Sequence, residues 1–322
     1  MTVVRGYPRL HFGLADLGRA TARAYGGSGV SLDGLSVDVE ARISRRHSLI
    51  GFDRLSDRAK DEVSAAVRRL EAELPGEPAF QLTLLSDLRE HVGLGSKTAL
   101  VLAALQASVL AAGATVNRRR LQMLSHRGGA SGVGVHAFFL GGLVVDAGHP
   151  QRDVEQLVPS AARAPADVPR LIGRFDFPED WRIRLALPAG ARLSGRSEIE
   201  FFERATPIPS SEVFETIAIL HHGILPAVVE ADFEALHKSL TALQLCGFKG
   251  REVAAQPPAV RALLERCQAI GPAGLSSLGP LVFAVVGSRA QEEALDDIVA
   301  QSDAADLGTW SVRDRGFEVV KP

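Results

Sequence analysis

Residues 91–98, with the sequence His-Val-Gly-Leu-Gly-Ser-Lys-Thr, combine the residue types that bind phosphate groups in proteins. The glycines let the backbone approach a ligand closely, the hydroxyls can donate hydrogen bonds, and the lysine adds a positive charge. This stretch lies between a strand-like run at 80–86 and an Ala/Leu-rich run at 98–112. A helix there would direct its first N–H groups and its dipole at an anion. The alternative is an ordinary strand-to-helix turn, because Gly-x-Gly alone is weakly specific.

Two further glycine-rich turns follow, at residues 127–134 and 274–280. Near the start of the chain, Arg9 and His11 alternate with apolar residues in an expected strand at 4–13, so the two polar groups share one face. Arginine offers a planar fork to a carboxylate or phosphate. The alternative for this pair is a surface or ion-paired role.

Apolar spacing and turn residues predict most of the remaining elements. Residues 25–29 are expected to form a flexible loop, and residues 149–180, with five prolines, a linker or a long connection. Further elements expected in the first half are a strand at 34–43, a helix at 56–74, a short helix capped by Asn117, and a hairpin at 138–146 with its tip at Gly141-Gly142. In the second half we expect strands at 181–187 and 281–286, helices within 210–246, 258–270 and 289–301, and a final strand.

The composition indicates a globular protein with a sizeable core. The chain has 322 residues, of which 46% are hydrophobic and 23% charged, and this length suggests two domains, at 1–160 and 161–322. A net charge of −2 argues against a nucleic-acid partner. The run at 98–112 is too short and too polar to span a bilayer, and residues 1–10 have no signal-like apolar core. We therefore expect a cytoplasmic protein with no membrane partner.

The order of the three glycine turns resembles the three motifs of the GHMP kinase superfamily, which includes galactokinase and the homoserine, mevalonate and phosphomevalonate kinases. The stretch at 92–99 is similar to the phosphate-cradling loop of that family. The resemblance implies an α+β fold of two domains, an N-terminal ribosomal-protein-S5-like domain and a C-terminal ferredoxin-like α+β domain.

Two departures from the kinase pattern narrow the resemblance. Kinases of this superfamily usually carry an aspartate in a Ser-Gly-Val-Asp pattern, where it is the base for the substrate hydroxyl, and this chain has Gly134 at that position. Lys97 also replaces a small residue in the loop. The phosphate cradle is thus kept, whereas the base is missing.

This combination resembles one branch, the beta-ribofuranosylaminobenzene 5'-phosphate synthases of methanopterin biosynthesis. The stretches that carry the resemblance are 9–17, 25–27, 91–96, 131–134, 141–148, 180–182 with Pro188, and 276–280, with Leu278 standing where tryptophan is expected. Enzymes of this branch join phosphoribosyl pyrophosphate to 4-aminobenzoate or 4-hydroxybenzoate with loss of pyrophosphate and CO2. The resemblance implies these substrates, Mg2+ bound with phosphoribosyl pyrophosphate, no organic cofactor, and a homodimer.

The residues expected to serve this chemistry fall into three groups. The catalytic candidates are Arg9, His11, Asp16 and Asp146, with both aspartates also considered for Mg2+. The phosphate-binding candidates are His91, Gly93, Leu94, Gly95, Ser96, Lys97 and Thr98. The substrate-binding candidates are Tyr25, Gly26, Gly27, Arg127, Ser131, Gly132, Ser276, Ser277 and Gly279. Two other functions stay open: an ATP-dependent small-molecule kinase with a base from elsewhere, and a ligand sensor without turnover.

Overall fold

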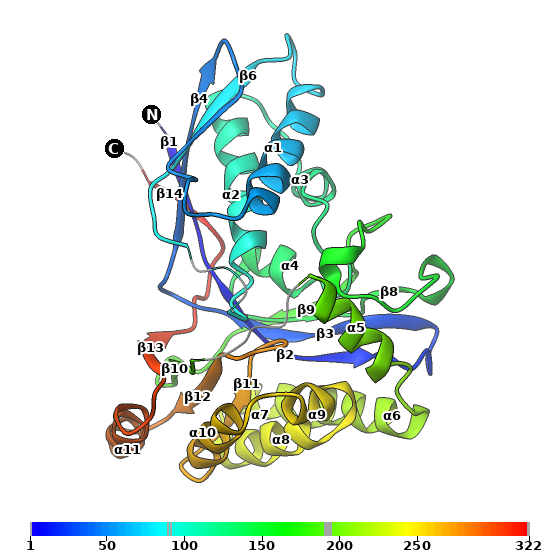
Figure 1. The fold of residues 1–322 in the computed structure, drawn as a ribbon, viewed down its shortest axis with the longest axis vertical. Helices are drawn as coiled ribbons and strands as arrows, with labels where there is room; N and C mark the ends of the chain where they lie inside the picture. Colours follow the sequence, from blue (N-terminus) through cyan, green and yellow to red (C-terminus); the bar gives the residue numbers. More distant parts are fainter. Residues whose placement is uncertain (1, 89, 91, 190–194, 321–322) are drawn as a thin grey trace.

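The computed structural model describes residues 2–88, 90, 92–189 and 195–320. It has an upper half built on one sheet, a middle sheet, and a lower half rich in helices (Figure 1). The chain begins and ends beside the upper sheet, whose strand order is β14-β1-β4-β6-β5. All neighbours in it are antiparallel except β5 and β6. Its strands are β1 Thr2–Gly6, β4 Val37–Ser44, β5 Ser48–Ile50, β6 Ala79–Leu84 and β14 Glu318–Val320.

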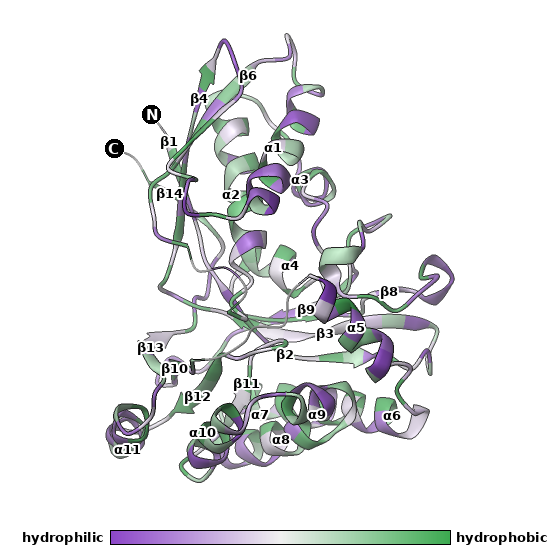
Figure 2. Ribbon diagram, viewed as in Figure 1, coloured by the Kyte–Doolittle hydropathy of each residue, from purple (hydrophilic) through white to green (hydrophobic). Residues whose placement is uncertain are grey.

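Helices α1 Asp57–Glu71 and α2 Ser96–Ala111 lie on one face of this sheet, and α3 Arg118–Leu124 packs against these two helices. The predicted helix after Ser56 is confirmed, because the Ser56 hydroxyl caps α1 by accepting the N–H of Ala59 at 3.2 Å. The helix after Asn117 is confirmed in the same way, since its side chain accepts the N–H of Arg120 at 2.9 Å. Helix α2 is apolar along most of its length (Figure 2) and is buried between the sheet and its neighbours.

The middle sheet has the order β2-β3-β7-β9, and β8 pairs with the far end of β3. Residues 25–29 lie inside β3, so the prediction of a flexible loop there was wrong. Glycines are needed in β3 because neighbouring backbone is very close: a Cβ on Gly27 would lie 2.3 Å from the carbonyl oxygen of Gly13. The strands are β2 Arg9–Asp16, β3 Arg23–Ser31, β7 Leu143–Asp146, β8 His149–Pro150 and β9 Leu171–Phe175.

The hairpin predicted at 138–146 was also wrong. Phe138 belongs to helix α4, Val133–Leu140, which lies against the middle sheet, and only the residues from Leu143 onward form a strand. Gly141, at φ 64°, ends the helix instead of forming a hairpin tip. A short, continuously apolar run has no period that separates a buried helix from a buried strand.

The lower half contains a four-stranded antiparallel sheet of order β11-β12-β10-β13, with helices beside it and under the middle sheet (Figure 1). Its strands are β10 Arg182–Leu187, β11 Ala273–Leu275, β12 Val282–Val286 and β13 Ala305–Ser311. Its helices are α6 Ser210–Ala218, a π-helical segment Ile219–Ile224, α7 Leu225–Val229, α8 Phe233–Leu245, α9 Gly247–Ala254, α10 Pro258–Gln268 and α11 Arg289–Ala300. Helix α5 Arg196–Ala205 lies beside the middle sheet. Short 3-10 turns lie at Gln151–Asp153 and Ser160–Ala162.

The chain crosses between the halves more than once. Strand β9 pairs with β7, and β14 pairs with β1, although both come after residue 160 in the sequence. The middle sheet packs on α4 from one side and on α6 and α9 from the other. Strand β2, which carries Arg9 and His11, therefore lies between α4 on one side and α6 and α9 on the other.

Within the described chain, one helical run, Ser210–Val229, is long and apolar enough to cross a membrane by length and composition. It comprises α6, the π-helical segment and α7. Leu220, Ile224 and Val228 on this run are buried in the core of the lower half. One face of the run is thus part of the protein interior.

Candidate active site

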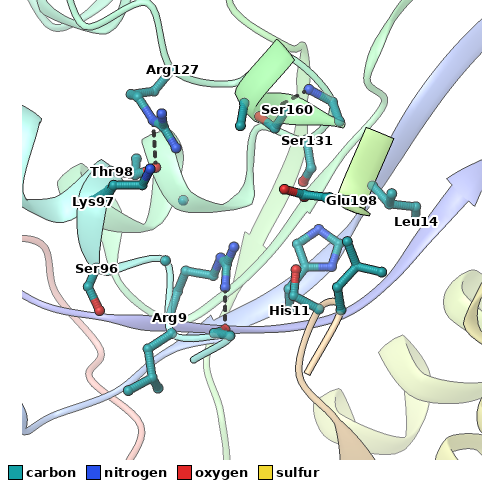
Figure 3. Close-up of a pocket in the computed structure, with 18 of the residues that line it drawn as sticks. Arg9, His11, Leu14, Ser96, Lys97, Thr98, Arg127, Ser131, Ser160 and Glu198 are labelled. Carbon is teal, nitrogen blue, oxygen red and sulfur yellow. Dashed lines mark hydrogen bonds between the residues drawn. The ribbon is translucent and has the colours of Figure 1, made fainter. Parts of the chain in front are cut away.

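A cavity of about 1160 Å³, counting its opening to solvent, lies where the halves meet (Figure 3). Its walls come from β2, from the start of α2, from the second and third glycine turns, and from helix α5. The three glycine turns and the strand that carries Arg9 and His11 are therefore brought to one place. The residues that line it include Arg9, His11, Gly93, Leu94, Gly95, Ser96, Lys97, Thr98, Arg127, Ser131, Gly134, Glu198, Phe202, Glu252, Ser277, Leu278 and Gly279.

The loop before α2 has the backbone expected of an anion site. Gly95 is the N-cap of α2, in the left-handed region at φ 64°, and contributes no side chain to the first helical turn. Gly93 has φ 97°, and a Cβ there would lie 2.5 Å from the carbonyl oxygen of Ser276. The first turn of a sixteen-residue helix therefore faces the cavity with its positive dipole end.

Two cations stand beside this helix start. The Nη1 of Arg127 donates to Glu62 at 3.2 Å, and its Nε donates to the hydroxyl of Thr98 at 3.1 Å. The Nζ of Lys97 lies 3.8 Å from Glu62 and is buried without a hydrogen-bond partner among the described residues. Burial lowers the pKa of Lys97, although the charge of Glu62 opposes this shift. A buried ammonium without a hydrogen bond is costly, and a bound phosphate would supply one.

Arg9 and His11 form the floor of the cavity, so the prediction that they share a face is confirmed. The Nη1 of Arg9 donates to the carbonyl oxygen of Gly93 at 2.7 Å, while its Nε is buried without a partner in the described structure. Burial, with the charge of Arg127, lowers the pKa of Arg9 to about 10. Burial, with the charges of Arg9 and Lys249, puts the pKa of His11 well below its usual value, so this imidazole is neutral at pH 7.

The third glycine turn is fastened to the floor. The Oγ of Ser276 donates to Gly93 at 2.8 Å and accepts the N–H of His11 at 3.1 Å. Ser276 is fully buried, and the cavity wall is formed by Ser277, Leu278 and Gly279 instead. Ser276 thus holds the turn against the phosphate loop.

A buried lysine supports this turn from behind. The Nζ of Lys249 donates to the carbonyl oxygens of Leu275, at 3.1 Å, and Ser277, at 2.9 Å, and forms an ion pair with Glu252. Lys249 is 1% exposed and Glu252 is 4% exposed. The position of Ser277 in the cavity therefore depends on a charge pair from α9.

The second glycine turn supplies Ser131 and Gly134 to the wall. The Oγ of Ser131 donates to Asp146 at 2.8 Å. Gly134 is the second residue of α4, and a Cβ there would lie 3.3 Å from the methyl group of Thr98. Where the kinase pattern has aspartate, this chain offers no carboxylate, and a Cβ would be in tight contact with Thr98.

Several predicted site residues lie outside the cavity wall. The carboxylate of Asp16 accepts backbone N–H groups of Gly18, Ala20 and Thr21, at 2.8 to 3.2 Å, which orders the turn after β2. Asp146 accepts the N–H of Gly148 at 2.8 Å in addition to the Ser131 hydroxyl, and burial raises its pKa to about 6. The carboxylates of both aspartates are therefore engaged by groups of the protein itself.

Other predicted residues have structural contacts. The hydroxyl of Tyr25 accepts the N–H of Val158 at 2.7 Å and donates to its carbonyl oxygen at 3.0 Å. Gly26 and Gly27 allow close backbone approach in β3, and a Cβ on Gly132 would lie 2.8 Å from the ring of His136. None of these residues lines the described cavity. His91 lies outside the described residues.

Sequence reasoning missed the acidic side of the site. Glu198 and Glu252 line the cavity, and Glu62 holds the two cations. Burial raises the pKa of Glu198 to about 6, although the charge of Lys97 opposes this shift. The sequence signal for these glutamates is the spacing of charged residues three or four positions apart on a helix. That spacing is typical of any solvent-exposed helix face, so it does not indicate a site.

Comparisons with known proteins identify the family of this chain. Residues 61–142 match the GHMP kinases N terminal domain, and residues 224–303 match the GHMP kinases C terminal domain. Beta-ribofuranosylphenol 5'-phosphate synthase of Archaeoglobus fulgidus is 34% identical over 99% of both chains. This chain belongs to that synthase family. The synthase of Methanothermobacter thermautotrophicus is also 34% identical, over 87% of both chains. The prediction of an enzyme of this family is thereby confirmed.

Solved structures confirm the predicted α+β GHMP-kinase-like fold. Phosphomevalonate kinase of Streptococcus pneumoniae is similar with a TM-score of 0.72 and 14% identity, over 97% of this chain and 100% of that one. Homoserine kinase of Cytophaga hutchinsonii has a TM-score of 0.69 and 15% identity, over 99% and 97%. At these identities the likeness concerns the fold alone.

Proposed function

We propose that this protein is a synthase that joins phosphoribosyl pyrophosphate to 4-hydroxybenzoate or 4-aminobenzoate, releasing pyrophosphate and CO2 and forming a carbon glycoside. The observation that carries the proposal is the similarity to a named synthase over 99% of both chains. Gly134 in the cavity wall supports it, because that position offers no base for an alcohol. The product would serve methanopterin biosynthesis, and thus one-carbon metabolism.

The charges in the cavity suit the first step of this reaction. Departure of pyrophosphate leaves positive charge on the ribose C1 and negative charge on the leaving group. Lys97, Arg127 and the first turn of α2 would stabilise that negative charge in a partly buried environment. Either the pyrophosphate or the 5'-phosphate can occupy this end.

The second and third steps belong to the aromatic acid. The ring carbon that bears the carboxylate attacks C1, and the para substituent supplies the electrons. The dearomatised ring is then the electron sink when CO2 leaves, so this sequence of steps needs no organic cofactor. The protein has to hold the ring against C1 in the correct orientation.

Mg2+ would arrive as a complex with the pyrophosphate substrate. The described residues contain no group of three or more His, Cys, Asp or Glu side chains placed to hold a metal ion. Asp16 and Asp146, the two residues expected to help, have their oxygens engaged by backbone N–H groups or by Ser131. Mg2+ commonly keeps several waters and substrate phosphate oxygens as ligands, so the ion does not require a dedicated protein cage.

One observation favours a kinase as the second candidate. Glu198 and Glu252 place carboxylates in the cavity wall, and a carboxylate there could accept a proton from an alcohol. Glu252 is already paired with Lys249, which leaves Glu198 as the only one of the two without an ion pair in the described structure. A kinase would bind an ATP analogue tightly and form ADP with an alcohol.

The test of the proposal is release of labelled CO2. The protein is mixed with phosphoribosyl pyrophosphate, Mg2+ and carboxyl-labelled 4-hydroxybenzoate or 4-aminobenzoate, with a control that lacks the pyrophosphate donor. We expect release that depends on that donor. If the folded protein releases none with either acid, the synthase proposal fails. Binding of the donor without product would instead indicate a ligand sensor.

Three further properties are proposed, the homodimer from the family resemblance and the other two from the charge and apolar patterning of the sequence. The protein would act in the cytoplasm, it would form a homodimer, and it would have no nucleic-acid or membrane partner. Size-exclusion chromatography with light scattering would measure the oligomeric state.

A further inference from the structure

The cavity is divided by charge and polarity. Lys97, Thr98 and Arg127 lie toward one end, whereas Glu198 lies toward the other, next to His11 and Leu14 (Figure 3). The phosphates of phosphoribosyl pyrophosphate would be attracted to the first end and repelled from the second. The second end is therefore left for the aromatic acid, which carries less negative charge than phosphoribosyl pyrophosphate.

The wall at this second end is apolar. Phe202 belongs to one hydrophobic cluster, against which Leu14 and Leu278 pack, and all three side chains line the cavity. Glu198 and Phe202 are four residues apart on α5, so they lie on one face of that helix. A carboxylate thus stands directly beside a surface that suits an aromatic ring.

Glu198 has no committed partner in the part of the chain that the structure describes. The neighbouring cavity carboxylate, Glu252, is paired with Lys249, but no hydrogen bond or ion pair engages Glu198. The charged groups that act on it are Lys97, Arg58 and Arg127, which favour its ionised form, and Glu252, which opposes it. Burial is the largest influence, and it raises the pKa of Glu198 to about 6.

We infer that Glu198 is a catalytic residue that accepts the proton of the para hydroxyl or amino group of the aromatic acid; this inference rests on the proposed function. The negative charge of Glu198 repels the benzoate carboxylate and accepts a hydrogen bond from a para donor. The unpartnered Nε of Arg9 on the floor attracts the benzoate carboxylate. The ring is thereby oriented with its reacting carbon away from Glu198.

The proton and electrons balance in two steps. As the ring carbon bonds to C1 and the bond from C1 to pyrophosphate breaks, the O–H or N–H bond of the para group breaks and its proton moves to Glu198. The ring becomes a neutral dienone or its imine counterpart. When the bond to the carboxylate breaks, its electrons restore the aromatic ring, and the para oxygen or nitrogen takes the proton back from Glu198. The carboxylate is regenerated in each turnover.

The test compares two acids in single turnovers of labelled CO2 release. The acids are 4-hydroxybenzoate and 3,5-difluoro-4-hydroxybenzoate, whose hydroxyl ionises more readily and needs less help from a base. Glu198→Gln should lose about 10²–10⁴-fold in rate on the first acid and clearly less on the second. Glu200→Gln, on the same helix and paired with Arg196, is the control and should match the unmodified protein on both.

Two measurements separate this role from a structural one. Glu198→Gln should bind phosphoribosyl pyrophosphate as tightly as the unmodified protein, and added formate should restore part of the rate of Glu198→Ala. An equal loss on both acids, or no loss at all, overturns the inference. If the unmodified protein releases no CO2 from either acid, the proposed function itself has failed.

Discussion

Replacement of Lys97 by methionine tests the phosphate end of the cavity. The Lys97 ammonium is buried, has no hydrogen-bond partner among the described residues, and lies 3.8 Å from Glu62. A charge-assisted hydrogen bond to phosphate contributes about 1.5–3 kcal/mol. Since about 1.4 kcal/mol corresponds to a tenfold change in affinity, Lys97→Met should weaken binding of phosphoribosyl pyrophosphate by roughly 10- to 100-fold.

The same substitution should leave the stability of the folded protein unchanged or raise it. Glu62 keeps its contacts with Arg127 at 3.2 Å and Arg58 at 3.0 Å when Lys97 is removed, and the cost of burying an ammonium disappears. The free energy of unfolding, measured with urea, should therefore not fall. Lys60→Met is the matched control, because Lys60 pairs with the exposed Asp57 on α1.

Isothermal titration calorimetry with phosphoribosyl pyrophosphate and Mg2+ measures the binding. Unchanged affinity in Lys97→Met would remove this residue from the site. A parallel loss of affinity and stability would show that the lysine supports the fold rather than the ligand. Only weaker binding at undiminished stability agrees with a lysine whose role is to bind phosphate.

Two further predictions concern the cavity walls. Gly95→Ala and Gly113→Ala both place alanine in the left-handed region, at a cost of about 1–2 kcal/mol. Only Gly95→Ala also places a Cβ 2.9 Å from the Arg9 guanidinium. Of the two variants, only Gly95→Ala should therefore weaken ligand binding in calorimetry. Lys249→Met leaves Glu252 buried without its partner and should lose about 3–5 kcal/mol in urea unfolding, whereas the double variant with Glu252→Gln should recover part of this. A double variant no more stable than the single one would contradict the second prediction.

Local chemistry made the phosphate end predictable from the sequence. Gly93, Gly95 and Lys97 are neighbours in the chain, so their arrangement depends on one turn and one helix start. The same reasoning failed at residues 25–29, where glycines indicated a loop. In the fold these glycines serve a different physical need, because a Cβ on Gly29 would lie 2.1 Å from the carbonyl oxygen of Leu10 on the next strand. Close approach of two strands is not visible in either strand alone.

The end of the cavity around Glu198 was not predictable from the sequence, because it is assembled from segments that are far apart in the chain. Leu14, Glu198 and Leu278 come from β2, α5 and the third glycine turn, and nothing in the chain near each one indicates the others. Asp16 was predicted to help bind Mg2+ because its carboxylate lies in the stretch 9–17 that resembles the synthases. Its carboxylate instead satisfies backbone N–H groups, which is the commoner use of an aspartate in a turn.

The pH dependence of the reaction tests whether charges at the Lys97 end of the cavity affect the ionisation of Glu198 at the other end. Glu198 must be ionised to accept a proton, and its pKa is about 6, so the rate should fall about tenfold for each pH unit well below that value. Bound phosphates would neutralise Lys97 and Arg127, whose charges favour the ionised form of Glu198. The acidic limb of kcat, which reports the substrate complex, should therefore lie at a higher pH than the acidic limb of kcat/KM, which reports the free enzyme. The limb should be missing from Glu198→Gln. If both proteins lose activity over the same pH range, the titrating group belongs to the substrate or to another side chain, and Glu198 does not take the proton.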